Sequence, residues 1–237
     1  MSAGKPAGKP DVYDLLIAGA TPAGCAAAIQ AQQRGLRTAI VITSAEPKAG
    51  TALDWLSPAG VEIAEKCGVT PKAAQATAFR GITLRSWNAQ NSARVNDSDL
   101  HGWIVDRTAF HAALCKVARA AGAELLSATA LAGLELGERD VVLNFADERE
   151  IMGRLLIIAD GPVSQTVALA RMPAAHRAES VSTRVTTVWK GDGHNAGVEV
   201  AIGTRREPQL ATILRAGGLI QATLVTRHTA LPADQQF

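Results

Sequence analysis

The stretch that most constrains the fold lies near the start of the chain, between residues 11 and 43. It contains a short apolar run, a glycine turn, an alanine-rich segment and a second apolar run. Short apolar runs are typical of buried strands, and a longer alanine-rich segment is typical of a helix. A strand, a glycine turn, a helix and a second strand within about thirty residues form the βαβ unit of dinucleotide-binding folds. We therefore predict parallel strands near 13–18 and 38–42, joined by a helix.

The turn between the first strand and the helix reads GATPAG over residues 19–24. Gly19 can adopt the backbone angles of a sharp turn, and Pro22 suits the first helical position, where a missing N–H removes no helical bond. Gly24 has no side chain, so the helix can lie close to the sheet. Thr21 replaces the second glycine of the GxGxxG fingerprint, and its hydroxyl can donate to a phosphate oxygen. Because a helix N-terminus attracts anions, the turn predicts a pyrophosphate site; a tight turn without a ligand is the alternative.

Downstream, the hydrophobic pattern alternates between helical and strand periods. We predict helices from Pro58, capped by Ser57; from Arg107, capped by Asp106; and over 163–171. We predict strands at 79–87, 93–95, 103–105 and 124–127, a β-hairpin of 131–136 with 141–145, and a strand at 154–159. The apolar run in this last strand indicates burial on both faces, as in a parallel sheet. Ser44–Leu56 is predicted to be a loop.

Beyond residue 172 the pattern changes to alternating β-type runs, at 181–189, 198–202, 211–214 and 219–226. We therefore predict an α/β fold, a Rossmann-like βαβ sheet with an antiparallel hairpin, followed by a β-rich region. The expected parts are a tail at 1–10, a domain at 11–172 with a strand insertion at about 79–105, and a β-rich domain at 173–237.

The composition restricts the classes of function. A chain of 237 residues with 47% hydrophobic residues can bury a substantial core. The net charge is +2 and the basic residues are scattered, which argues against a nucleic-acid groove. No apolar run is long enough to span a membrane, and the polar N-terminus does not resemble a signal peptide. The three cysteines are far apart in the sequence, which argues against disulfides and against a metal site and favours the cytoplasm.

The individual cysteine and histidine side chains give little indication of a catalytic or metal-binding role. Cys25, in the first turn of the predicted helix, either has a lowered pKa or packs as a small apolar residue behind the turn. The histidines show no ligand spacing and are expected on the surface or in loops; they are His101, His111, His176, His194 and His228.

Three separated motifs together resemble one family. They are GATPAG after a strand, WIVDRTAF at 103–110 opening a helix, and LIIADG at 156–161. Their order and spacing are similar to those of FAD-dependent oxidoreductases of the p-hydroxybenzoate hydroxylase and geranylgeranyl reductase type. The resemblance covers about residues 12–170. It implies a Rossmann-like FAD-binding sheet, followed here by part of a β-rich substrate domain.

The resemblance also implies a set of residues that contact the cofactor. The turn and helix would hold the FAD pyrophosphate through Gly19, Thr21, Pro22, Ala23 and Gly24.

Other implied contacts come from later motifs. Arg107 would lie near the flavin phosphates and ribityl chain, since a guanidinium can pair with phosphate at two points. A solvated first-turn arginine is the alternative. Asp160 and Gly161 are associated with the cofactor, although Asp-Gly also favours a simple turn. The main chain of Leu131 matches the position that meets adenine.

The chain departs from the family pattern in two ways. The acid that usually binds the adenosine ribose is expected near Ile42 or Thr43, and neither carries a carboxylate. Losing it would cost ~2–3 kcal/mol of cofactor affinity. The family's later Gly-Asp motif and helix, which cover the flavin end, have no counterpart before Phe237. We therefore expect a fragment or a short form that binds FAD weakly or not at all and exposes apolar surface that favours self-association.

The function implied is that of an FAD-dependent monooxygenase or reductase acting on a small organic substrate, with NAD(P)H as a possible reductant. No catalytic residue can be assigned from the sequence. A non-catalytic remnant of the fold, serving as a binding module, is the alternative. A nicotinamide-dependent dehydrogenase is disfavoured, because the hairpin and the Asp160-Gly161 strand have no place in that fold.

Overall fold

The computed structural model describes residues 12–42, 52–95, 101–127, 130–161, 164–172, 181–191, 196–203 and 209–228. Contacts between these residues divide the chain into two compact units. Unit 1 consists of Met1–Lys48 and His111–Ala174, and unit 2 of Ala49–Phe110 and Ala175–Phe237. Unit 2 thus takes in the chain from residue 49, earlier than the 79–105 insertion predicted from the sequence. The predicted tail at 1–10 lies outside the described residues.

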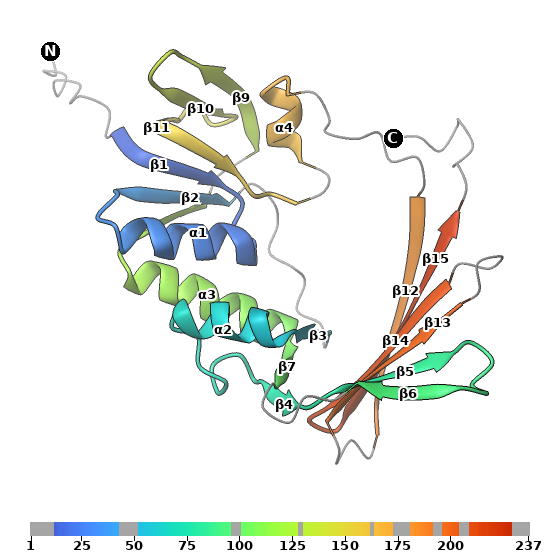
Figure 1. The fold of residues 1–237 in the computed structure, drawn as a ribbon. Helices are drawn as coiled ribbons and strands as arrows, with labels where there is room; N and C mark the ends of the chain where they lie inside the picture. Colours follow the sequence, from blue (N-terminus) through green and yellow to red (C-terminus); the bar gives the residue numbers. More distant parts are fainter. Residues whose placement is uncertain are drawn as a thin grey trace, which may run out of the picture. The chain divides into compact units, whose positions relative to one another are not determined.

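Unit 1 is built on a six-stranded sheet in the order β8-β2-β1-β11-β10-β9 (Figure 1). The first four strands in this order run parallel, whereas β10 runs antiparallel to both of its neighbours. The strands are β1 (Val12–Ala18), β2 (Thr38–Ile42), β8 (Glu124–Ser127), β9 (Leu131–Leu136), β10 (Val141–Phe145) and β11 (Glu150–Ile158). The predicted mainly parallel sheet with an antiparallel hairpin at one side is therefore confirmed.

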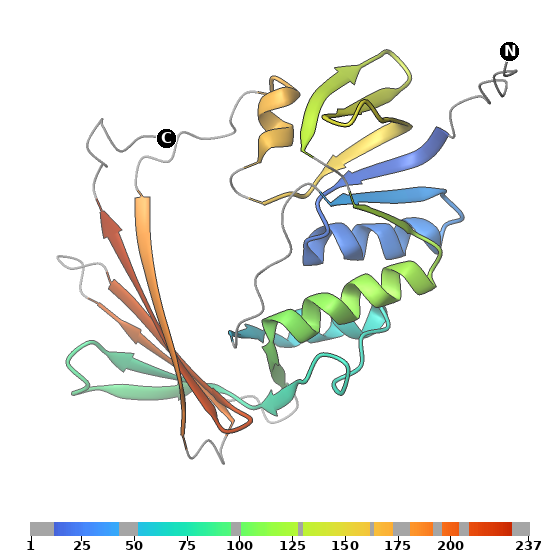
Figure 2. The same ribbon diagram turned by 180° about the vertical axis from the view of Figure 1, so that it is seen from behind.

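The helices of this unit are α1 (Pro22–Gln32), α4 (Gln165–Leu169) and the larger part of α3 (Arg107–Ala120). Views from both sides show α1 alongside β2, with α3 next to α1 (Figures 1 and 2). The predicted cap of α3 is confirmed, because Asp106 accepts the N–H of Ala109 at 2.8 Å. The start of α4 has a cap that was not predicted, since the Ser164 hydroxyl accepts the N–H of Val167 at 2.9 Å. These caps satisfy N–H groups that a helix start otherwise leaves unpaired.

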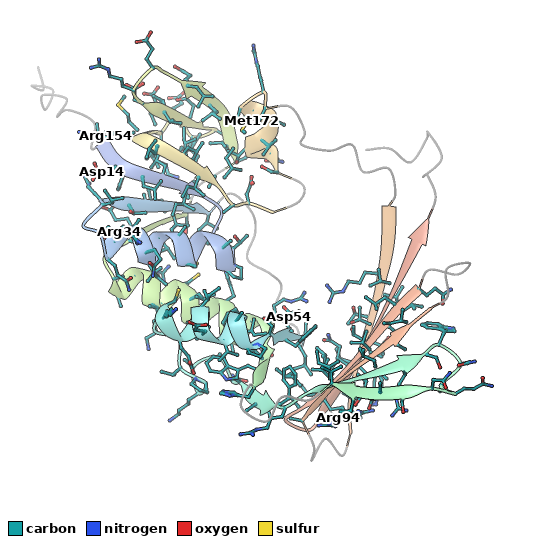
Figure 3. All side chains as sticks on the ribbon, viewed as in Figure 1. Asp14, Arg34, Asp54, Arg94, Arg154 and Met172 are labelled. Carbon is teal, nitrogen blue, oxygen red and sulfur yellow. The ribbon has the colours of Figure 1, made fainter. Side chains whose placement is uncertain are left out.

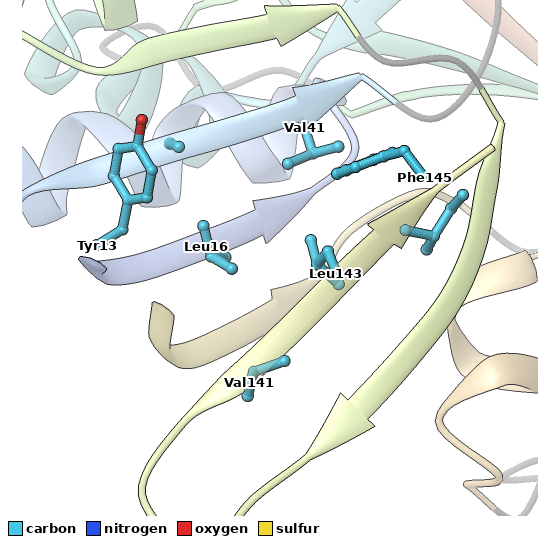
Figure 4. Packing of buried hydrophobic residues seen from close by; sticks show 8 residues of the cluster. Tyr13, Leu16, Val41, Val141, Leu143 and Phe145 are labelled. Atoms are coloured by element: carbon cyan, nitrogen blue, oxygen red, sulfur yellow. The ribbon is translucent and has the colours of Figure 1, made fainter. Parts of the chain in front are cut away.

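One face of the sheet is covered by an apolar cluster (Figure 4). Its buried members come from four strands of the same sheet, β1, β2, β9 and β10; they are Tyr13, Leu16, Ala39, Val41, Leu131, Val141, Leu143 and Phe145. Fully burying an aliphatic side chain of this size contributes about 1.5–3 kcal/mol. The hairpin is thus held to the parallel strands by packing as well as by backbone hydrogen bonds.

Strand β11 differs from its prediction in one respect. Leu155 and Ile157 are 64% and 39% exposed, so the strand is not buried on both faces. Leu155 pairs in register with Leu15 and Ile157 with Ile17, and these partners on β1 are buried. Because α1 covers β1 and β2, it shields the partners but leaves this face of β11 open. A salt bridge at 3.8 Å also joins Asp14 on β1 to Arg154 in the middle of β11, both labelled in Figure 3.

Unit 2 contains a six-stranded sheet, β12-β15-β14-β13-β5-β6, and a three-stranded sheet, β3-β7-β4. Their bounds are β3 (Leu53–Leu56), β4 (Thr77–Phe79), β5 (Ile82–Ser86), β6 (Ser92–Val95), β7 (Gly102–Asp106), β12 (Val181–Lys190), β13 (Gly197–Ile202), β14 (Gln209–Ala216) and β15 (Leu219–His228). Helix α2 (Pro58–Lys66) begins after the predicted cap Ser57. The predicted β-rich character of the later chain is confirmed.

Strand β3 is the main element that the sequence did not predict. Its four residues fall in a stretch predicted to be a loop. It forms because β7 offers an antiparallel partner, pairing Leu53 with Asp106 and Leu56 with Trp103. The signal for this strand therefore lies about fifty residues away along the chain, not in its own composition.

The side chain of Gln221 joins the two sheets of unit 2. It is 1% exposed, accepts the backbone N–H of Leu53 at 2.6 Å and donates to the Leu53 carbonyl at 2.7 Å. An amide side chain here acts as a strand partner for the edge of β3. Buried backbone groups need such partners, so the amide secures β3 on both sides.

We expect Gln221→Leu to lower the free energy of unfolding by about 2–4 kcal/mol, because it leaves a buried N–H and C=O of Leu53 unpaired. Gln209→Leu is a matched control at a half-buried site on the same sheet, where no such bond is lost, and should change it by less than about 0.5 kcal/mol. Urea unfolding of the three proteins measures both effects. Equal stability of the Gln221 variant and the unaltered chain would contradict the role given to this amide.

Among the helices that the structure describes, none is long and apolar enough to cross a membrane.

Candidate cofactor site

The glycine turn brings the chain closer to its neighbours than any side chain would allow. Gly19 has φ +102°, and a Cβ there would lie 2.5 Å from the carbonyl oxygen of Ala159. A Cβ on Gly24 would collide with the carbonyl oxygen of Gly19 and come within 3.2 Å of Ile17. Both positions therefore require glycine, one for the turn and its approach to β11, the other for packing of α1 on β1.

Thr21 is the N-cap of α1. Its hydroxyl donates to the Ala159 carbonyl at 2.7 Å and accepts the N–H of Gly24 at 3.3 Å. The sequence predicted that this hydroxyl donates to a phosphate oxygen, but its proton is directed to Ala159. Thr21 thus links the start of α1 to the segment after β11 by hydrogen bonds. In this arrangement a phosphate would be bound by the backbone N–H of Thr21 and not by its hydroxyl.

The start of α1 suits an anion. The first turn holds no acidic residue, and Pro22 and Ala23 are exposed. The helix spans 11 residues, long enough to give its N-terminus a partial positive charge. Backbone N–H groups at such a terminus can donate to phosphate oxygens, so the residues present fit a pyrophosphate.

Asp160 and Gly161 lie beside this turn, about 140 residues away in the sequence. A Cβ on Gly19 would come within 2.6 Å of the Asp160 Cα, which shows how close the two motifs are. One Asp160 oxygen, Oδ2, accepts from the hydroxyl of Thr166 at 2.8 Å and from its N–H at 3.3 Å. The other, Oδ1, is buried and has no partner among the described residues. A buried oxygen without a partner is costly, so this atom suits a donor supplied by a ligand.

Arg107 has a partner within unit 2. Its Nε and Nη2 donate to the two carboxylate oxygens of Asp54 on β3, at 2.6 and 2.7 Å (Asp54 is labelled in Figure 3). This hydrogen bonding to Asp54 raises the pKa of Arg107, so the guanidinium stays charged. The described residues provide no partner for its Nη1. The predicted phosphate contact of Arg107 stays a prediction.

Two further predicted contacts have different outcomes. The Leu131 side chain belongs to the apolar cluster of unit 1, at the start of β9. Its main-chain role toward adenine stays a prediction. Strand β2 ends at Ile42, and Thr43 lies outside the described residues.

A cluster of sulfur and nitrogen atoms that sequence reasoning missed lies behind the turn. The Sγ atoms of Cys25 and Cys115 are 3.7 Å apart, and the His111 Nε2 lies 3.6 Å from the Cys115 Sγ. The carbonyl oxygen of Ala20, in the turn, lies 2.5 Å from the same Nε2 and 3.5 Å from the Cys25 Sγ. Cysteines distant in sequence are therefore neighbours. The detectable signal was His111 four residues before Cys115, which places both on one helix face.

The two thiols of this cluster differ in acidity. Hydrogen bonding from Cys25, aided by His111 and Arg119, lowers the pKa of Cys115 to about 5, against the opposing effect of burial. The same contact and burial raise the pKa of Cys25, which is fully buried. Of the two alternatives given for Cys25, a lowered pKa or packing as a small apolar residue behind the turn, its burial agrees with the second. The thiol with the lowered pKa is that of Cys115.

Comparison with known proteins identifies the class that this fold and turn define. Residues 12–204 match the FAD binding domain family. The chain belongs to that family. It is 31% identical over 155 residues to a menaquinone reductase of Mycobacterium tuberculosis, covering 64% of this chain and 38% of that protein. It is 26% identical over 162 residues to a digeranylgeranylglycerophospholipid reductase of Methanosarcina acetivorans, covering 65% of this chain and 39% of that protein.

Solved structures support the same fold. A geranylgeranyl bacteriochlorophyll reductase-like protein of Thermoplasma acidophilum superposes with a TM-score of 0.73 at 17% identity, over 91% of this chain and 56% of that one. A p-nitrophenol 4-monooxygenase of Pseudomonas putida superposes with a TM-score of 0.72 at 11% identity, over 94% and 60%. The chain spans about two fifths of the length of the curated relatives that it matches.

Two helix starts offer a test of the turn, because Thr21-Pro22-Ala23-Gly24 and the segment 57–60, Ser-Pro-Ala-Gly, have the same cap geometry. We expect Gly24→Ala to destabilise by about 1–3 kcal/mol, since its Cβ meets backbone. At Gly60 the nearest atom to a Cβ is 3.4 Å away, so Gly60→Ala should be neutral or stabilise by up to about 1 kcal/mol. Urea unfolding compares the two; equal effects would contradict the close approach described here.

Proposed function

We propose that this chain is the FAD-binding part of an FAD-dependent oxidoreductase that acts on a small organic substrate. The observation that carries the proposal is the meeting of the glycine turn with Asp160 at the ends of β1 and β11. In an open parallel sheet, ligands bind beyond the carboxyl ends of the strands. The family match over 12–204 supports FAD as that ligand.

The reductase type is favoured over the monooxygenase type. Both relatives compared at the sequence level, at 31% and 26% identity, are named as reductases. The p-nitrophenol 4-monooxygenase is only 11% identical to this chain, so its similarity supports the fold and not the type of reaction. The same relatives weigh against a non-catalytic remnant, because both are named as enzymes.

The roles proposed for individual residues follow from their surroundings. The start of α1, from Gly19 to Gly24, would hold the pyrophosphate by backbone donors. Asp160 Oδ1 would accept a hydrogen bond from the cofactor. Arg107 would add positive charge toward a phosphate, while keeping its bond to Asp54. FAD itself, when bound, supplies the electron transfer, so the chain's own task is to hold and orient it.

Three finer features complete the proposal. NAD(P)H is proposed as the reductant, in line with the reductase type. Leu131 is proposed to contact adenine through its main chain, and Thr43 to lie near the ribose. A reducing compartment such as the cytoplasm is supported by three free thiols.

The anion site can be tested without disturbing the fold. Ala23→Glu places an acid in the exposed first turn of α1, where it favours the helix dipole and repels a pyrophosphate. We expect FAD affinity to fall by at least about tenfold with stability unchanged or raised. Ala59→Glu, at the equivalent exposed position of α2, is the matched control and should leave FAD affinity unchanged. Quenching of flavin fluorescence on titration measures both.

Two results would contradict the proposal. One is the absence of saturable quenching by the unaltered chain. The other is equal FAD affinity of the unaltered chain, the Ala23 variant and the Ala59 variant. Thermal unfolding of each protein, followed by circular dichroism, establishes that the variants are folded.

Self-association is proposed through the open face of β11. Leu155 is 64% and Ile157 39% exposed on this face. We expect Leu155→Glu to lower the apparent mass in size-exclusion chromatography with light scattering, because a charge on an apolar contact opposes association. Ile63→Glu, a substitution at a 58% exposed position of α2, is the control that should leave the mass unchanged. A monomeric unaltered chain would contradict this prediction.

A further inference from the structure

Two of the distances between atoms behind the glycine turn match those between the ligands of a zinc ion. Zinc bonds thiolate sulfur at about 2.3 Å and imidazole nitrogen at about 2.0–2.1 Å in a tetrahedron. Those bond lengths separate two sulfur ligands by about 3.8 Å and a sulfur from a nitrogen ligand by about 3.6 Å. The Cys25–Cys115 Sγ separation is 3.7 Å, and Cys115 Sγ lies 3.6 Å from His111 Nε2.

We propose that Cys25, His111 and Cys115 form a zinc-binding site that joins α1 to α3 behind the turn. The three side chains offer one ligand atom each, all within 4.8 Å of one another. They come from one compact unit, Cys25 from α1 and the other two from successive turns of α3. Three protein ligands leave the fourth position of the tetrahedron to water.

The charge balance suits this place. Two thiolates and a neutral imidazole offset the double charge of zinc, so the loaded site is neutral overall. Neutrality matters because Cys25 is fully buried, and an unbalanced ion there would be strongly unfavourable. His111 and Cys115 are partly exposed, which gives the ion a path from solvent on the α3 side.

The same sulfur spacing disfavours a disulfide. A disulfide requires an S–S distance of about 2.05 Å, so the two sulfurs at 3.7 Å would have to move much closer together. A zinc ion requires no such movement of the two sulfurs. Thiol contacts by themselves contribute little, because S–H is a weak donor. A bridging ion therefore accounts for the convergence better than either alternative.

The test uses the full 237-residue chain, reduced and freed of metal by a chelator. Titration with Zn²⁺ against a colorimetric chelator measures stoichiometry and affinity. Co²⁺ replaces Zn²⁺ as a spectroscopic probe, since thiolate ligands give charge-transfer bands and a tetrahedral site gives intense d–d bands. We expect one ion per chain, both sets of cobalt bands, and a higher midpoint of thermal unfolding with Zn²⁺.

Two variants and a control locate the ion. Cys115→Ser and His111→Gln each remove one ligand, and each should weaken Zn²⁺ binding by at least about 100-fold, more than the loss of an outer contact. Cys67→Ser changes the remaining cysteine, which is buried in unit 2, and should keep one tight site. Circular dichroism of each variant verifies folding, while the cobalt spectrum of the unaltered chain needs no variant.

Three outcomes would overturn the proposal. The first is no stoichiometric Zn²⁺ binding by the reduced chain. The second is unchanged affinity in both ligand variants. The third is a Cys25–Cys115 disulfide, detected by mass spectrometry in a chain that binds no zinc after reduction. None of these measurements depends on FAD, so they test the zinc site independently of the proposed function.

Discussion

The arrangement of unit 1 depends on how closely the backbone of the glycine turn approaches the end of β11. Gly19 and Gly24 leave no room for a Cβ, because carbonyl oxygens of Ala159 and of the turn itself occupy that space. The Thr21 hydroxyl then bonds the same Ala159 carbonyl. Consequently the start of α1, the end of β1 and the Asp160-Gly161 motif meet at one place. Any ligand bound there would contact main chain from two strands and one helix start.

The parts of this site that the sequence predicted are those with local signals. The turn, its glycines and the strand before Asp160 each carry a pattern within a few residues, and all were placed correctly in the fold. The interactions that it missed join residues far apart. Nothing near Arg107 indicates Asp54, and nothing near Cys25 indicates Cys115, 90 residues away. The hydrogen bond of the Thr21 hydroxyl was also missed, because its acceptor Ala159 follows β11, 138 residues later.

The fold shows the same division between local and distant causes. Helix caps such as Ser57 and Asp106 act within three residues and were predicted. Strand β3 and the exposed face of β11 were not, since one depends on pairing with β7 and the other on which strands α1 covers. Likewise the sequence pattern predicts a domain boundary after residue 172, whereas unit 2 combines two segments that are separate in the sequence. Hydrophobic periodicity records which side of a strand is apolar, but not which distant element covers it.

The bond between Gln221 and Leu53 has a consequence for the newly made chain. The two residues are 168 positions apart, which at about 5–20 residues per second is roughly 10–30 s of translation. Until Gln221 emerges, the outer edge of β3 presents an N–H and a C=O without their final partner. An unpaired strand edge invites pairing with other chains. During that interval this short edge is therefore exposed to pairing with other chains.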